Sequence, residues 1–232
     1  RFQLTPFVSD FSKTFTMPSS PRRPYTGSCH CGRTQYIVFL PFPPANDTAH
    51  PERGIRIYKC NCTTCHKMGL LHVRLPSKHN DFFLLSPLPR EEDGEQERKG
   101  NEPDLTAAAA DGGGEGLVGY QCNAKQTRWY FCPTCGVRTF AHWGEGFVDE
   151  VDLSSALGED EGKEDGKLTK VWRPKEQAEP EESYFSVNGM TLDAGQKGLD
   201  LREWHEKGWI GYVDALEFRE DRGRKPHVGG CY

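Results

Sequence analysis

Three cysteines, Cys60, Cys62 and Cys65, lie within six residues of the chain. Thiolates held this close repel each other unless a cation neutralises them, so the spacing is typical of a metal site. Zinc in proteins takes four ligands, and three thiolates leave the fourth position open for water or substrate, as in catalytic zinc sites. A centre with three thiolates carries net negative charge and suits a further soft ligand such as a thiol. His66 or Cys122 could instead supply the fourth ligand, and the site would then be structural.

Two further cysteine pairs have the spacing of metal ligands. Cys29 and Cys31 form a C-x-C motif between glycines, and Cys132 and Cys135 form a C-x-x-C motif followed by Gly136. Together the two pairs supply four thiolates, which is the complete ligand set of a structural zinc site. Such a zinc would join an early strand to a later hairpin and would contribute directly to folding. The alternative is that the four are reduced thiols of an ordinary core.

The nine cysteines fit other chemistries less well. An odd number leaves one thiol outside any disulfide framework, and neighbouring thiols in a C-x-C motif reach disulfide geometry with difficulty. The run from Cys62 to His66 matches the attachment motif of c-type haem, but that match ignores the other motifs. Cys122 and Cys231 remain single. We therefore expect two zinc ions per chain.

Other side chains carry weaker signals. His142 is the best placed for proton transfer, because it follows the C-x-x-C motif closely, but lone histidines are more often surface or core residues. The aromatic residues Trp204, Trp209 and Tyr212 have near-helical spacing and are expected to pack a C-terminal helix. The other histidines to which we assign no role are His30, His72, His79, His205 and His227.

The elements that must position the cysteines are mostly strands. Residues 27–32 form a turn that leads into a strand at 33–40, and a strand at 55–58 runs directly into the central cysteines. Residues 200–208 have an N-cap aspartate and a glycine after lysine, which indicates one short helix. Further strands are expected at 72–75, 81–85, 117–120, 127–131, 137–142 and 184–188, the 117–120 and 127–131 pair as a hairpin.

The composition divides the chain into a tail and one domain. Residues 1–24 are rich in Ser, Thr, Pro and Arg and are interpreted as a tail, in which Met17 begins a stretch that reads as a protein start. Residues 25–232 then form a single zinc domain with insertions at about 86–116 and 155–182. Both are acidic, so we expect solvated insertions; for the segment 86–116 an acidic interaction segment is the alternative.

Charge and hydropathy limit the partners and the location. The formal net charge of −5 gives no electrostatic footprint for nucleic acid or for an anionic membrane. No apolar run approaches the roughly 18 residues that span a bilayer, and the beginning of the chain lacks the apolar core of a secretory signal. We expect a cytoplasmic protein in a reducing compartment. Nothing in the sequence indicates its oligomeric state.

The order and spacing of the motifs resemble a known family. GSCHCG at 27–32, CNCTTC at 60–65 and YFCPTCG at 130–136 are similar to the motifs of glutathione-dependent formaldehyde-activating enzymes, a family that includes centromere protein V. The resemblance covers residues 24–153, and residues 187–193 are similar to its closing strand. Residues 201–212 and 226–230 resemble the corresponding segments of fungal members of this family.

The resemblance implies a fold, a pair of metal sites and an activity. The fold would be mainly β, an antiparallel β-tent with one or two short helices, shared with methionine sulfoxide reductase B and a Rab-exchange zinc protein. Cys29, Cys31, Cys132 and Cys135 match the structural zinc ligands, and CNCTTC matches the substrate-site zinc. The implied activity is that of a carbon–sulfur lyase, which joins or releases a thiol such as glutathione and a carbonyl compound. The insertions depart from the family pattern and could reshape the pocket for a larger substrate.

A second function from another class also fits these features. A zinc scaffold without catalysis could bind a protein partner, as the Rab-exchange and centromere relatives of the resemblance suggest. The two functions differ at the three-cysteine site, because only the enzyme needs a metal position that a small thiol or carbonyl compound can reach.

Overall fold

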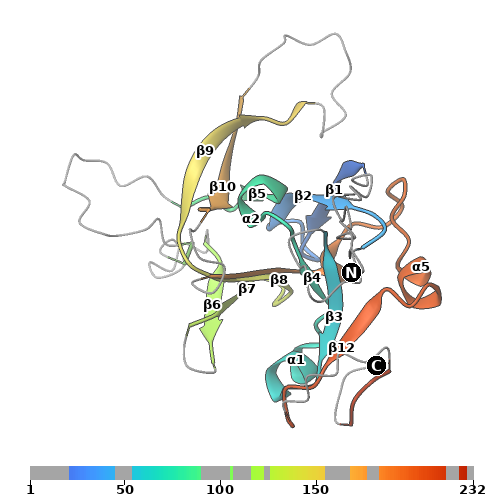
Figure 1. The fold of residues 1–232 in the computed structure, drawn as a ribbon. Coiled ribbons are helices and arrows are strands. Elements are labelled where there is room, and N and C mark those ends of the chain that lie inside the picture. The colour runs from blue at the N-terminus through green and yellow to red at the C-terminus, as the bar shows by residue number, and fades with distance from the viewer. Residues whose placement is uncertain are drawn as a thin grey trace, which may run out of the picture.

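A computed structural model describes residues 21–44, 54–89, 105–106, 116–122, 126–154, 168–176, 183–217 and 225–228. Over these residues the chain is mainly β, with two sheets and a few short helices, which confirms the expected fold class (Figure 1). No helix within the described ranges has the length and apolar character needed to cross a membrane.

The strands form one sheet of five and one sheet of seven. Among the described residues, the strand pairs are antiparallel except β12 with β3, which is parallel. The first sheet has the order β1 (Arg22–Ser28), β2 (Gln35–Pro41), β5 (Phe82–Ser86), β10 (Leu168–Pro174) and β9 (Gly146–Asp152). The second has the order β12 (Ile210–Val213), β3 (Arg56–Cys60), β4 (His72–Arg74), β11 (Tyr184–Asn188), β8 (Arg138–Trp143), β7 (Arg128–Phe131) and β6 (Val118–Gln121).

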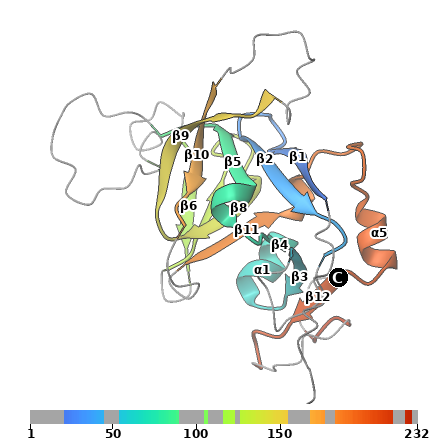
Figure 2. The same ribbon diagram turned by 45° about the horizontal axis from the view of Figure 1, so that its top comes forward.

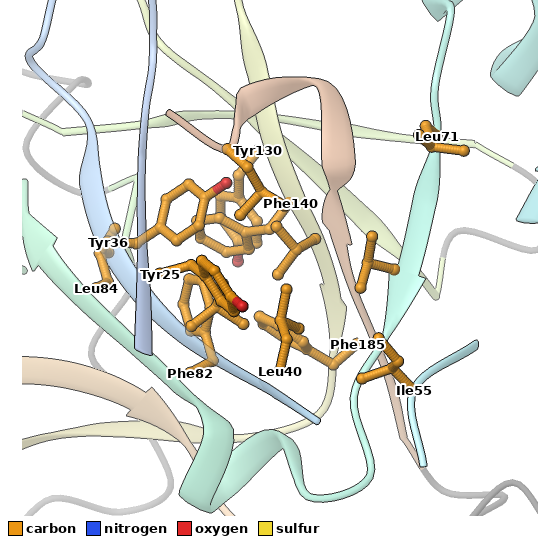
Figure 3. Packing of buried hydrophobic residues seen from close by; sticks show 14 of the residues in the cluster. Tyr25, Tyr36, Leu40, Ile55, Leu71, Phe82, Leu84, Tyr130, Phe140 and Phe185 are labelled. Atoms are coloured by element: carbon orange, nitrogen blue, oxygen red, sulfur yellow. The ribbon is translucent and has the colours of Figure 1, made fainter. Parts of the chain in front are cut away.

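The two sheets share one main core. Phe82 of β5 lies 5.1 Å from Phe140 of β8 and 4.6 Å from Phe185 of β11, measured between ring centroids. Tyr36, Leu40 and Leu84 of the first sheet surround the same contact, as Figure 3 shows. Burying each of these large side chains contributes roughly 1.5–3 kcal/mol, so the core fixes the sheets against each other.

Within the described residues, four short helical segments join the strands. They are α1 (Thr63–Met68), α2 (Lys78–Asp81), η3 (Gly189–Thr191) and α5 (Leu201–Glu206). The helix α5 was expected from the sequence, and the Asp200 side chain accepts a hydrogen bond from the Arg202 backbone N–H as its N-cap. The helix α1 was not expected, because its N-cap is Cys62, whereas Ser, Thr, Asp or Asn is the usual sequence signal for a helix start.

The tail assignment is wrong at its C-terminal end. β1 begins at Arg22, inside the segment 1–24, and pairs with β2 along its whole length. An edge strand tolerates Pro24 because one side of its backbone needs no ladder hydrogen bonds. The Arg22 guanidinium lies 4.2 Å from the centre of the Phe39 ring and forms an ion pair with Asp81, so tertiary contacts order a segment that local composition assigns to a tail.

The two intervals assigned to insertions also contain ordered residues. Leu105 is 3% exposed and belongs to the main core, and its carbonyl accepts a hydrogen bond from Leu117 N–H. β10 lies within the interval 155–182 and pairs with β9 over seven residues. These anchors correct the expectation that the intervals are solvated throughout. Residues 90–104, 107–115, 155–167 and 177–182 lie outside the described residues, as do residues 1–20 with Met17, and Cys231.

Candidate metal centres

The structure brings the two distant cysteine pairs together in a four-cysteine cluster. The Sγ atoms of Cys29, Cys31, Cys132 and Cys135 all lie within 4.8 Å of one another. The Sγ atom of Cys31 is 3.5 Å from that of Cys29 and 3.6 Å from that of Cys132. Four sulfurs at about 2.3 Å from a zinc ion lie about 3.8 Å apart, so the cluster fits Zn²⁺.

A similar glycine-terminated turn presents each cysteine pair. One turn connects β1 to β2 and the other connects β7 to β8, and in each the first cysteine's carbonyl accepts a hydrogen bond from the glycine N–H that follows the pair. Gly32 has φ of 75° and Gly136 has φ of 70°, which is the left-handed region that glycine enters at no steric cost. The motif spacing therefore encodes both halves of the cluster locally.

Electrostatics favour the thiolate at Cys29. Burial by itself raises the pKa of this thiol, but hydrogen bonds from the Thr34 backbone N–H and from the Cys31 side chain outweigh burial and bring the pKa to about 6. A thiol with this pKa is mostly ionised at neutral pH, which is the form that binds a metal.

The second centre is the three-cysteine cluster, formed by Cys60, Cys62 and Cys65, whose sulfurs also lie within 4.8 Å of one another. Cys60 ends β3, Cys62 is the N-cap of α1, and Cys65 lies buried on α1. Hydrogen bonds from Cys60 and Cys65 lower the pKa of the Cys62 thiol to about 2, whereas the pKa of Cys65 is raised by its two neighbours. The three thiols thus share negative charge that a cation would neutralise.

The turn that carries these cysteines is held by the residues at the end of β12 and directly after it. Asn61 is 4% exposed, and its side-chain amide donates to Asp214 Oδ1 at 2.7 Å and accepts from the Ala215 N–H at 2.7 Å. The Asn61 N–H donates to the Val213 carbonyl at 3.2 Å, directly after the parallel pairing of β12 with β3. Figures 1 and 2 both place α1, β3 and β12 side by side. The cluster therefore lies at a sheet edge where hydrogen bonds from both the backbone and the Asn61 side chain hold the turn.

The two candidates for a fourth ligand do not join the three-cysteine cluster. His66 is exposed on α1, and Cys122 Sγ lies 3.3 Å from Thr64 Oγ1. Within the described ranges, no fourth His, Cys, Asp or Glu ligand atom belongs to this group. As described, the cluster offers three protein ligands.

The structure adds His72 to this centre. His72 Nε2 lies 3.2 Å from Cys65 Sγ, and Nδ1 lies 2.8 Å from Ser186 Oγ and 3.2 Å from Tyr184 Oη. Burial lowers the pKa of His72 to about 4, so the imidazole is neutral at pH 7 and carries one N–H. If Nε2 carries the proton, it donates to the Cys65 sulfur while Nδ1 accepts from a hydroxyl. No spacing motif links His72 to the cysteines, which is why the sequence left it unassigned.

His142, which the sequence favoured among the histidines for proton transfer, lies in the core. It is 4% exposed, packs against Trp172 and Phe185, and its ring nitrogens lie 3.2 Å from the Tyr184 carbonyl and 3.3 Å from the Glu145 carbonyl. Both ring nitrogens therefore face backbone oxygens. This is the setting of a core histidine.

The burial of His142 predicts a dependence of stability on pH. Burial lowers its pKa to about 4 from 6.5, so the unfolded state binds more protons between these values and stability falls as the pH drops below 6.5. Between pH 7 and 5 the loss from this residue is about 2 kcal/mol. Urea unfolding of wild type and of His142→Gln measures it, because the difference between their unfolding free energies should shrink by this amount. A difference that stays constant with pH, at unchanged zinc content, contradicts the prediction.

Comparison with known proteins gives one weak likeness. The sequence matches no protein-family model. A crystal structure of a Rhodobacter sphaeroides protein from structural genomics aligns with 77% of this chain and 93% of its own, at 16% identity and a TM-score of 0.35. A likeness this weak assigns neither a fold family nor an activity. The fold and the clusters define the class: a mainly β protein with two cysteine clusters that could each bind a metal ion.

Proposed function

We propose that the protein is a zinc-dependent carbon–sulfur lyase of the glutathione-dependent formaldehyde-activating type. Its substrate would be the adduct of a thiol, glutathione or a similar compound, with an aldehyde or another carbonyl compound. The observation that carries the proposal is the three-cysteine cluster, in which three sulfurs converge and no fourth ligand from the described residues joins them. A structural site has a complete ligand set, as the four-cysteine cluster does, whereas a catalytic site keeps one position for substrate.

The two clusters have separate roles in this proposal. Cys29, Cys31, Cys132 and Cys135 would hold a structural zinc ion, and the three-cysteine cluster would hold the second ion. Zinc bound there would lower the pKa of an incoming thiol and keep its sulfur ionised.

The chain's own residues would position the reactants. His72 Nε2 lies 3.2 Å from Cys65 Sγ and would orient that sulfur, and Leu70, Trp129 and Ala141 pack against Cys60 and Cys65. In the forward reaction the thiol sulfur bonds to the carbonyl carbon, the second electron pair of the C=O bond moves to oxygen, and the thiol proton ends on that oxygen. The reverse reaction breaks the S–C bond. Because no electrons leave the reactants, no redox partner is needed.

Cys62→Ala tests the proposal. Zinc content should fall from two ions per chain to one, because only the three-cysteine cluster loses a ligand. Lyase activity on thiol–aldehyde adducts should fall at least about a hundredfold, the effect of losing a few kcal/mol of metal-supplied stabilisation. Elemental analysis and a spectrophotometric assay of adduct formation measure the two quantities.

Cys122→Ala is the matched control for this test. Cys122 lies beside α1 but outside the cluster, so its removal should leave both the zinc content and the activity close to those of wild type. One zinc ion in the wild-type chain would refute the two-site assignment. Two zinc ions without activity on any thiol–carbonyl pair would favour the scaffold that binds a protein partner.

A further inference from the structure

A row of polar side chains leads away from the three-cysteine cluster. His72 Nε2 lies 3.2 Å from Cys65 Sγ, and His72 Nδ1 lies 3.2 Å from Tyr184 Oη. The same Tyr184 hydroxyl is 2.9 Å from Tyr58 Oη. The Arg74 guanidinium lies 4.4 Å from the centre of the Tyr184 ring. Two side chains, those of His72 and Tyr184, therefore connect a cysteine of the cluster to a permanent positive charge.

A second arginine adds to the positive charge at this place. His72 and Arg74 are two positions apart on β4, so their side chains lie on the same face of the sheet. Directly opposite on β3, Arg56 pairs with Arg74 in the antiparallel register. Like charges in such cross-strand pairs repel each other, and Arg74 has no ion pair with any residue that the structure describes. A negatively charged group bound here would offset the repulsion and pair with Arg74.

The arginines and the cluster both act on the Tyr58 hydroxyl. Burial is the main cause that raises its pKa, the charges of Arg74 and Arg56 lower it, and the charge of Cys65 raises it. Such interactions fade beyond about 8–10 Å, so Tyr58 Oη lies near both the arginines and the cluster. Cys62 of the cluster and Arg74 at the other end of the row are both partly exposed. A ligand in solution therefore has access to both ends.

We propose that Arg74, with Arg56 beside it, binds a carboxylate of the thiol substrate and makes the protein selective for thiols that carry one. The assignment of the ligand as substrate rests on the proposed function, in which the substrate sulfur binds at the three-cysteine cluster. A guanidinium group matches a carboxylate with two parallel hydrogen bonds. Three residues of peptide span up to about 10 Å, so a thiol of tripeptide size, such as glutathione, can reach from the cluster to Arg74. Arg74 then sets specificity and takes no part in forming the S–C bond.

Glutathione and its diethyl ester are the probes, because the ester has the same thiol and backbone but no free carboxylate. Isothermal titration calorimetry of the zinc-loaded full chain should give the ester a dissociation constant roughly tenfold or more above that of glutathione, as expected for a lost charge-assisted hydrogen bond. In Arg74→Gln the dissociation constant of glutathione should rise by the same factor, whereas that of the ester should change by less than about twofold. Arg74→Lys keeps the charge without the planar fork, so it should retain part of the preference for glutathione.

Arg202→Gln is the matched control. Arg202 is exposed on α5 and forms an ion pair with Asp200, and both views place α5 apart from α1 (Figures 1 and 2). The same loss of charge at this position should leave both dissociation constants unchanged.

Three results overturn the proposal. They are no binding of glutathione, equal affinity of the wild type for glutathione and its ester, or an equal loss for both probes in Arg74→Gln, which would show that Arg74 acts only by packing on Tyr184. The comparison of the two probes in wild type needs no variant, so it decides the matter even if Arg74→Gln does not fold. Arg74-dependent binding of glutathione without lyase activity refutes the proposed function and keeps the carboxylate site. Lyase activity without a preference for the free carboxylates does the reverse.

Discussion

Cys132→Ala is expected to prevent the chain from forming a cooperatively folded state. Cys132 is fully buried and supplies one of four sulfurs that join the β1–β2 turn to the β7–β8 turn. Structural zinc sites contribute about 10–16 kcal/mol to folding, whereas the net stability of a domain is about 5–15 kcal/mol. Losing most of the zinc contribution would therefore exceed the net folding stability of the chain. Circular dichroism during urea unfolding measures the result, and a strong chelator should reproduce it in wild type.

The other cluster provides the control for this experiment. Cys62→Ala makes the same chemical change at a half-buried cysteine and leaves the four-cysteine cluster intact, so it should still unfold cooperatively. A Cys132→Ala protein with the wild-type unfolding midpoint would show that the four thiols do not hold a structural metal.

His72→Phe is expected to weaken metal binding at the three-cysteine cluster by about 10–100-fold, the usual effect of removing a group that holds a metal ligand. Phenylalanine retains the ring that stacks on Tyr58, whose centroid lies 4.6 Å from that of His72, but it cannot donate to Cys65. Affinity is measured by competition with a coloured chelator, which should remove one zinc ion before the other.

His72→Gln separates the hydrogen bond from packing. Its side-chain amide can donate from a place close to that of Nε2, so it should recover part of the affinity that His72→Phe loses, although it lacks the stacked ring. The affinity of the four-cysteine cluster should be the same in both variants. Equal metal affinity in wild type and His72→Phe would show that His72 contributes only packing and does not orient Cys65.

Local sequence determined the pieces of both clusters. Each cysteine motif closes within a few residues, and glycine after Cys31 and Cys135 permits the tight turns that aim the sulfurs. The strand that ends at Cys60 and the helix capped by Asp200 also follow from local sequence patterns, namely residue alternation and helix capping. These features were predictable because their interactions span only a few residues of chain.

Tertiary structure alone decided how the pieces meet. His72 contacts Ser186 across 114 residues, and Asn61 contacts Asp214 across 153. Neither pair has a spacing signature, because the contacts depend on which strands become neighbours: β4 beside β11, and β12 parallel to β3. Likewise, Arg22 and Leu105 lie in segments whose composition predicts no order, and the shared core orders them. A sequence pattern predicts local turns, strands and helix ends. The contacts that hold the cysteine clusters in place depend on which side chains are buried together, and this is determined only when the sheets assemble.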